Sequence, residues 1–174
     1  MRDETDESPP GFEETFCRLF DQQFQSLFRY LQRLTGDADL ANDLAQEVFV
    51  RLYQRASLPD DTRGWMGAVA HNLLRDQQRT ASRRLRLVKT RTEGVSPEQP
   101  VGADEKMLAD ERREAVRGAL DRLSARDRRM LLLRHEGYSY REIAHALGVK
   151  ETSVGTLLLR ATTAFHKALG ESLS

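Results

Sequence analysis

Basic side chains concentrate in one part of the chain, where their chemistry suits binding to phosphate groups. Formal net charge is zero, with 27 Lys and Arg against 27 Asp and Glu, but the charges are separated along the sequence. Residues 51–91 have ten basic and three acidic side chains, whereas residues 1–50 have four basic and eleven acidic ones. The densest stretch, RDQQRTASRRLRLVKTR at 75–91, is typical of a nucleic-acid-binding surface. Taken alone, a basic run of this kind is equally compatible with a solvated linker.

A second stretch suited to nucleic acid is YSYREIAHALGVKETSVGTLLLRATTAF, residues 138–165. Ser139 and Glu142 have the spacing of a capping box at the start of a short amphipathic helix, and Gly148 supplies a tight turn. Another helix follows from about Glu151. Two short amphipathic helices joined by such a turn predict a helix-turn-helix. A plain helical packing unit has the same pattern, and the second helix contributes only Arg160 as a basic residue.

No residues have the spacing of a catalytic or metal site, so we predict a protein without enzymatic activity, cofactor or metal. The four histidines are scattered and none belongs to an HExxH pattern: His71, His135, His145 and His166. The single cysteine, Cys17, has no partner for a disulfide, and we predict that it is a core thiol. The apolar run at 130–133 is far shorter than the about 20 residues of a membrane span. Because the N-terminus is acidic, unlike a signal peptide, we predict a cytoplasmic protein without membrane insertion.

The elements that must position these residues are predicted to be helices. Apolar residues with three-four spacing mark a first helix that ends at Gly36: Phe20, Phe24, Leu27, Phe28, Leu31 and Leu34. A second helix has a buried stripe of Leu40, Leu44, Val48 and Leu52 and a polar face opposite. A loop at 57–64 precedes a third helix. Residues 88–104, with two prolines and no apolar period, read as a flexible tether.

The predicted fold is therefore all-α, with two small helical domains joined by a flexible linker. We place the domains at residues 12–88 and 109–170 and the linker at 89–108, after a disordered N-terminus at 1–11.

Three stretches together resemble the bacterial sigma factors of the extracytoplasmic-function (ECF) type, which contain only regions 2 and 4. GDADLANDLAQEVFVRLYQR is similar to the family's region 2 pattern and matches it at Asp43, Gln46, Glu47 and Phe49. GWMGAVAHNLLRDQQR matches the following stretch at Trp65, Ala70, Asn72, Asp76 and Arg79. LDRLSARDRRMLLLRHEGYSYREIAHALGV resembles region 4, which would make 12–88 a region 2 helical bundle and 109–170 a region 4 helix-turn-helix.

The resemblance implies a transcription initiation factor that binds core RNA polymerase and recognises promoters. Contacts with the β′ clamp helices would come from Asp43, Gln46, Glu47, Phe49 and Arg51. Region 4 would meet the β flap, and an anti-sigma factor that covers these surfaces is also implied.

Promoter DNA is the other implied partner. The 57–64 loop and the helix after it would engage the −10 element, where an unstacked base is captured on single-stranded DNA. The implied −10 contacts are Asn72, Arg75, Asp76, Arg79, Arg83 and Arg84. The implied −35 contacts are Arg141, Lys150, Thr152, Ser153, Thr156 and Arg160.

The helix that would read the −35 element departs from the family pattern, because Gly155 and Leu157 replace the usual Lys and Arg. Glycine inside a helix costs about 0.8–1.0 kcal/mol relative to alanine. Either close approach of the backbone to DNA compensates this cost, or the helix is weak there. Leu157 and Leu159 are alternatively an exposed apolar surface for a protein partner. A tethered region 4 needs few charges of its own, because the linker sets its effective concentration at the promoter.

Two other functions are compatible with parts of the sequence. One is a dimeric helix-turn-helix regulator that is not a polymerase subunit, although such a protein has no reason to contain DLAQEVF. The other is a helical interaction protein whose arginines are merely solvated. Salt-sensitive binding to DNA or polymerase would separate the latter from both DNA-binding functions.

Overall fold

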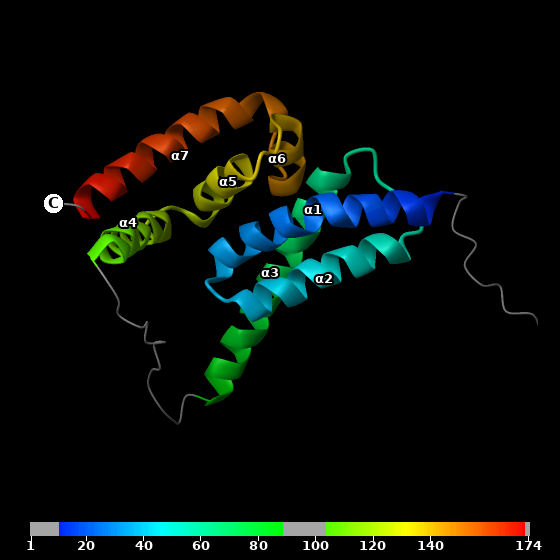
Figure 1. Ribbon diagram of the computed structural model, residues 1–174, viewed down its shortest axis with the longest axis horizontal. Helices are drawn as coiled ribbons and strands as arrows, with labels where there is room; N and C mark the ends of the chain where they lie inside the picture. Colours follow the sequence, from blue (N-terminus) through cyan, green and yellow to red (C-terminus); the bar gives the residue numbers. More distant parts are fainter. Residues whose placement is uncertain (1–10, 89–103, 173–174) are drawn as a thin grey trace, which may run out of the picture.

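The computed structural model describes the backbone of residues 11–88 and 104–172 and the side chains of 11–80 and 111–171. The described residues form α-helices and no β-strand, which confirms the all-α prediction (Figure 1). The helices are α1 (Phe12–Thr35), α2 (Ala38–Gln54), α3 (Thr62–Val88), α4 (Asp104–Asp121), α5 (Ala125–His135), α6 (Tyr140–Leu147) and α7 (Glu151–Ser172). Residues 1–10 of the predicted disordered N-terminus (1–11) and residues 89–103 of the predicted linker (89–108) lie outside the described residues. Residues 104–108 of that predicted linker instead belong to α4.

The N-terminal half consists of α1, α2 and α3. Gly36 ends α1 in the left-handed conformation, with φ of 71°, and its N–H donates to the carbonyl of Gln32. The side chain of Asp37 then caps α2 by accepting a hydrogen bond from the N–H of Leu40. This two-residue connection turns the chain so that α2 packs along α1. Leu44, Val48 and Leu52 are buried, as the stripe predicts, and Leu40 is half-buried.

The C-terminal half consists of α4 to α7 and contains the predicted helix-turn-helix in α6 and α7. The capping box is present: Ser139 accepts from the N–H of Glu142, whose carboxylate accepts from the N–H of Ser139. Gly148 forms the turn with φ of 65°. One face of α7 packs inward through Val154, Leu158 and Ala161, as predicted.

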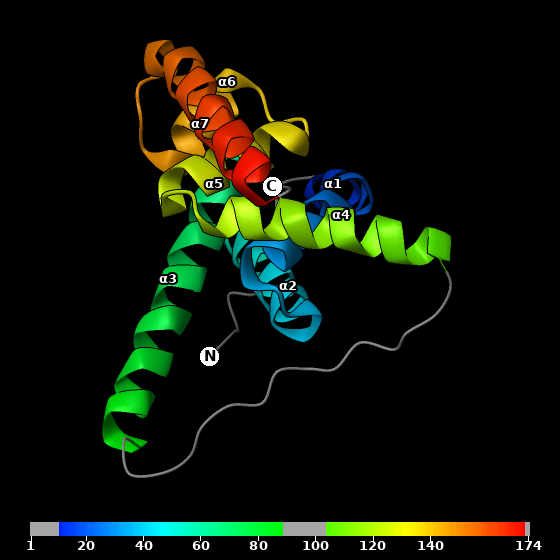
Figure 2. The same cartoon turned by 90° about the vertical axis from the view of Figure 1, so that its left-hand side faces the viewer.

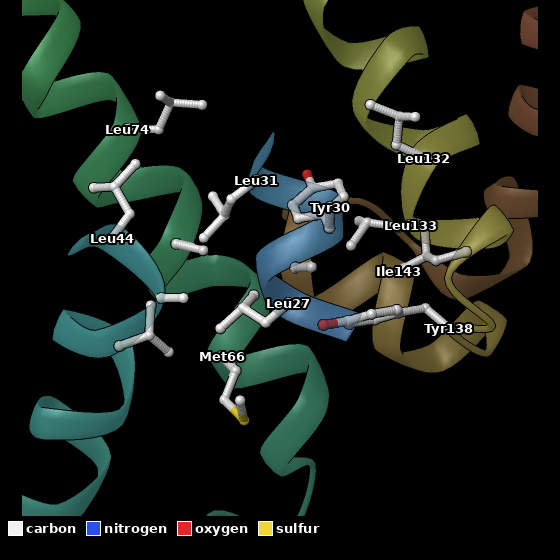
Figure 3. Packing of buried hydrophobic residues seen from close by; sticks show 14 of the residues in the cluster. Leu27, Tyr30, Leu31, Leu44, Met66, Leu74, Leu132, Leu133, Tyr138 and Ile143 are labelled. Carbon is white, nitrogen blue, oxygen red and sulfur yellow. The ribbon is translucent and has the colours of Figure 1, made fainter. Parts of the chain in front are cut away.

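The two halves pack against each other, which the sequence did not predict. Figure 3 shows side chains of α1, α3, α5 and α6 meeting in one continuous core, among them Leu27, Leu31, Met66, Leu133 and Ile143. The main contacts join α6 to the N-terminal part of α3, and further contacts join α5 to α1. Figure 2 shows the C-terminal turns of α3 extending away from the other helices.

Cys17 is exposed, so the prediction of a core thiol is wrong. The preceding residue, Phe16, packs its ring against Phe49 and Tyr53. Successive residues of a helix lie about 100° apart around its axis. The residue after a core-facing ring therefore points away from that contact.

Candidate polymerase and nucleic-acid interfaces

The polar face of α2 is open to solvent. Asp43 and Gln46 are exposed. The Nε of Arg51 donates to Oε1 of Glu47 at 2.8 Å, and 47% and 45% of the two side chains are exposed. This pair, four residues apart, keeps both charged groups on the same helix face. The four polar residues predicted to contact polymerase thus form one accessible surface, which we call the α2 polar face.

Phe49, also predicted as a polymerase contact, lies in the core and is only 3% exposed. Its ring centroid is 4.9 Å from that of Phe20 and 5.8 Å from that of Phe24. Phe49 therefore fixes α1 against α2 and offers little surface to a partner. The sequence did not indicate that three large apolar side chains on these helices would be exposed to solvent, namely Phe20, Val50 and Tyr53.

The residues predicted to contact the −10 element follow one face of α3. Asn72, Arg75, Asp76 and Arg79 are exposed, at spacings of three and four residues that place them on the same side of the helix. Arg75 donates to the Oδ1 of Asn72 at 3.3 Å. The side chains of Arg83 and Arg84, also predicted here, lie outside the described side chains.

The loop before α3 is held by hydrogen bonds of its own. Thr62 donates from its hydroxyl to the carbonyl of Pro59 at 2.7 Å, and Asp61 Oδ1 accepts from the N–H of Gly64 at 3.0 Å. A Cβ at residue 64 would lie 2.1 Å from Asp61 Oδ2, so any other residue at this position would require the Asp61 carboxylate to shift. Asp61 Oδ2 also lies 2.8 Å from Nδ1 of His145 on α6. The loop is therefore fixed both internally and against the C-terminal half.

The residues predicted to contact the −35 element lie on α6, on α7 and in the turn between them. Most are exposed, namely Arg141, Lys150, Thr152, Thr156 and Arg160, and Ser153 is half-buried. Arg160 also lies 3.5 Å from a carboxylate oxygen of Asp127 on α5. All six residues thus belong to the helix-turn-helix, and all except Ser153 are exposed.

The surroundings of Gly155 bear on its unusual presence in α7. A Cβ at this position would meet Tyr140 Cε2 at 3.5 Å, which is an ordinary contact, so packing within the protein does not require glycine. Tyr140 is 44% exposed, and the guanidinium of Arg134 lies 5.6 Å from its ring centroid. The sequence prediction included neither Arg134 nor Tyr140, because both precede α7, the helix predicted to contact DNA. Leu159 is exposed, as one alternative proposed, whereas Leu157 is half-buried against the core.

Comparisons with known proteins match both halves. Residues 19–84 match the family model described as Sigma-70 region 2, and residues 113–164 match Sigma-70, region 4. The ECF RNA polymerase sigma factor SigL of Mycobacterium tuberculosis is 34% identical over 158 residues, which cover 88% of each chain. The chain belongs to the family of ECF RNA polymerase sigma factors. SigX of Bacillus subtilis, another ECF sigma factor, is 29% identical over 163 residues, or 89% of this chain and 84% of SigX.

The fold is also that of a solved sigma factor. RpoE of Bartonella quintana, in a complex with the anti-sigma factor NepR, superposes with a TM-score of 0.67 at 19% identity, covering 90% of this chain and 98% of RpoE. As an ECF sigma factor, the protein binds core RNA polymerase and directs promoter recognition and transcription initiation. The comparisons do not favour the dimeric regulator.

The described part of this sigma factor contains no helix long and apolar enough to cross a membrane. Within the same residues, no three His, Cys, Asp or Glu side chains are grouped so that they could hold a metal ion.

Proposed function

We propose a division of work between two segments of this sigma factor. Residues 12–88 form the region 2 unit, which binds core polymerase and the −10 element. Residues 109–170 form the region 4 unit, which binds the −35 element and the β flap, and residues 89–108 link the two. The family matches at 19–84 and 113–164 support this division.

The α2 polar face is the proposed docking surface for the β′ clamp helices. The observation that carries this assignment is the alignment of Asp43, Gln46, Glu47 and Arg51 on one exposed face, with the Glu47–Arg51 pair at 2.8 Å. Phe49 supports this face from beneath by packing α2 on α1. Charged residues at an exposed interface affect the association rate and its salt dependence more than they affect affinity.

Reversing two charges tests this assignment. We expect the double change Asp43→Lys and Glu47→Lys to weaken binding to core polymerase about 10- to 100-fold, equivalent to roughly 1.4–2.8 kcal/mol. The matched control is Glu111→Lys with Glu114→Lys, which makes the same charge change at exposed positions of α4. Binding is measured by competition for fluorescently labelled chain, and circular dichroism checks the fold. Equal affinities for the two variants would contradict the assignment.

The exposed face of α3 is the proposed contact surface for the −10 element. In this proposal Asn72 and Asp76 read an unstacked base through hydrogen bonds, and Arg75 and Arg79 bind phosphates of the single strand. Arg83 and Arg84 extend the same proposal along the helix. On the helix-turn-helix, Arg141, Lys150, Thr152, Ser153, Thr156 and Arg160 are the proposed −35 contacts, and their exposure supports this assignment.

We further propose that the protein works in the cytoplasm and has no catalytic activity, cofactor or resident metal. Control by an anti-sigma factor is also proposed, supported by the complex in which the similarly folded RpoE is bound to NepR. Co-purification of the tagged chain from its native host, followed by loss of core-polymerase binding when the captured protein is added back, tests this partner.

A further inference from the structure

The first turns of α7 present a face without charged side chains. Residues with the spacing of one helix side form this face, which we call the α7 uncharged face: Thr152, Gly155, Thr156 and Leu159. Leu159 is 70% exposed, both threonines are exposed, and the glycine is half-buried. The buried residues of these turns lie on the other side of the helix, so the α7 uncharged face points away from the core.

The ring of Tyr140, the first residue of α6, extends this face. A Cβ at residue 155 would lie 3.5 Å from Cε2 of the ring, so the ring stands directly beside Gly155. Tyr140 is 44% exposed. A longer side chain at residue 155 would begin in contact with the ring, whereas glycine leaves that edge of the ring open. An aromatic surface therefore adjoins the α7 uncharged face.

Basic side chains adjoin this surface but do not occupy it. The guanidinium of Arg134 lies 5.6 Å from the centroid of the Tyr140 ring. Lys150 is exposed and lies directly before α7. On the side towards α5, a guanidinium nitrogen of Arg160 lies 3.5 Å from a carboxylate oxygen of Asp127. Positive groups at the margins of a binding surface are suited to the phosphates on either side of a DNA groove.

The side chains of the α7 uncharged face differ in kind from those that usually select guanine or adenine. Those bases are commonly recognised by bidentate hydrogen bonds from Arg, Lys, Asn or Gln, and none of these residue types stands on the face. Threonine hydroxyls bond to several bases without selecting one. Thymine is distinguished in the major groove by its methyl group, which apolar side chains and threonine methyl groups contact. The chemistry of the face therefore favours thymine.

The small extent of the apolar surface favours DNA over a protein partner. Tyr140 and Leu159 are the only large apolar side chains that are exposed on α6 and α7 within the described residues. A stable protein interface buries about 800 Å² on each partner and has an apolar centre. One ring and one leucine between threonines and basic residues do not supply such a centre. They are sufficient to contact a few methyl groups between two phosphate backbones.

We propose that this sigma factor recognises its −35 element through thymine methyl groups, which the α7 uncharged face and Tyr140 contact in the major groove. Gly155 lets the backbone of α7 approach the base pairs, and Leu159 and the methyl group of Thr156 contact the thymine methyl groups. The −35 element therefore contains adjacent A·T pairs, and guanine is not its main determinant. This inference rests on the proposed assignment of the helix-turn-helix to the −35 element.

Deoxyuridine tests the methyl contact, because it differs from thymidine only in lacking the methyl group. Holoenzyme assembled from the full chain and core polymerase first identifies a promoter by run-off transcription on genomic fragments. Each thymidine of the −35 element is then replaced in turn, on both strands, and binding of holoenzyme to the duplex is measured by competition at fixed salt. We expect two or more positions to lose about three- to fivefold in affinity, as for loss of one buried methyl group.

The matched control places deoxyuridine in the spacer between the two promoter elements, where we expect no change in affinity. If replacement at every −35 position also leaves the affinity unchanged, the inference is overturned. An element composed mainly of G·C pairs would overturn it as well.

Combining the two kinds of change identifies the side chains that touch the methyl groups. If Leu159 contacts a thymine methyl group, deoxyuridine at that position weakens binding of the wild-type chain but has no further effect on Leu159→Ala. We expect the same for Tyr140→Ala at another position, whereas Tyr140→Phe should behave as the wild type. The control Val116→Ala shortens an apolar side chain on α4 that is 40% exposed, and it should retain every deoxyuridine effect. Undiminished deoxyuridine effects in both alanine variants at Leu159 and Tyr140 would overturn the inference.

Scrambling the −35 element separates this inference from the function on which it rests. We expect scrambling to reduce transcription at least about tenfold, since a single mismatched base pair already costs several-fold in affinity. Loss of transcription on scrambling without any effect of deoxyuridine would overturn the methyl contact alone. Transcription that is insensitive to scrambling would also contradict the assignment of the helix-turn-helix to the −35 element, and would leave the α7 uncharged face to a protein partner.

Discussion

Replacing Glu136 with Gln should weaken the packing of the C-terminal half on the N-terminal half. The carboxylate accepts hydrogen bonds from Arg29, at 3.2 and 2.9 Å, from Arg33, and from the hydroxyl of Ser26 at 3.3 Å. All of these donors belong to α1, whereas Glu136 follows α5. The whole interaction is therefore lost when the halves separate, and water then solvates the carboxylate.

The magnitude follows from the exposure of the partners. A hydrogen bond to a charged group contributes about 1.5–3 kcal/mol, but 50% and 39% of the two arginine side chains are exposed, so solvent screens their charge. Gln also keeps one carbonyl acceptor and is less costly to bury than a carboxylate. We expect a net loss of roughly 1–2 kcal/mol, which lowers the ratio of chains with packed halves to chains with separated halves about 5- to 30-fold.

Single-molecule energy transfer between dyes on α2 and α4 measures that ratio directly. Added salt should also lower the ratio of packed to separated halves in the wild-type chain. The effect of salt should be smaller in the variant, because the variant lacks the ion pair that salt screens. The matched control is Glu171→Gln, which removes an exposed pair with Arg122 inside the C-terminal half. If both variants give the wild-type distribution of distances, the Glu136 cluster does not hold the halves together.

Three further changes have defined outcomes. Burial lowers the pKa of His71 to about 4 from its usual 6.5. Between pH 4 and 6.5 the unfolded state therefore binds more protons than the folded state, and the free energy of unfolding should fall by roughly 2 kcal/mol from pH 7 to pH 5. Urea titrations should show a weaker pH dependence for His71→Gln than for the exposed control His135→Gln. Gly155→Ala should raise the free energy of unfolding by about 0.5–1 kcal/mol but reduce transcription from promoters that need a −35 element. An increase in both stability and transcription would refute a close approach of the α7 backbone to DNA. Neutralising Arg75, Arg79 and Arg83 to Gln should reduce promoter opening more than core binding, and should lower the salt slope of single-strand binding by about 2.

The sequence predicted well those features that depend on neighbours along the chain. The capping box at Ser139, the turn at Gly148 and the buried stripe of α2 follow from local hydrogen bonding and helical periodicity, and all three are present. Phe49 shows the limit of a motif match. It lies four residues after buried Ala45 and three before buried Leu52, so periodicity places it in the core even though the family pattern groups it with exposed residues.

The packing of region 4 on region 2 could not be predicted in this way. One close contact joins Gly67 to Ala146, and two small residues in separate helices produce no periodic signal. Its charged partners, Glu136 with Arg29 and Arg33, are about a hundred residues apart and each is compatible with an ordinary surface position. Only the arrangement in space shows that these side chains are partners.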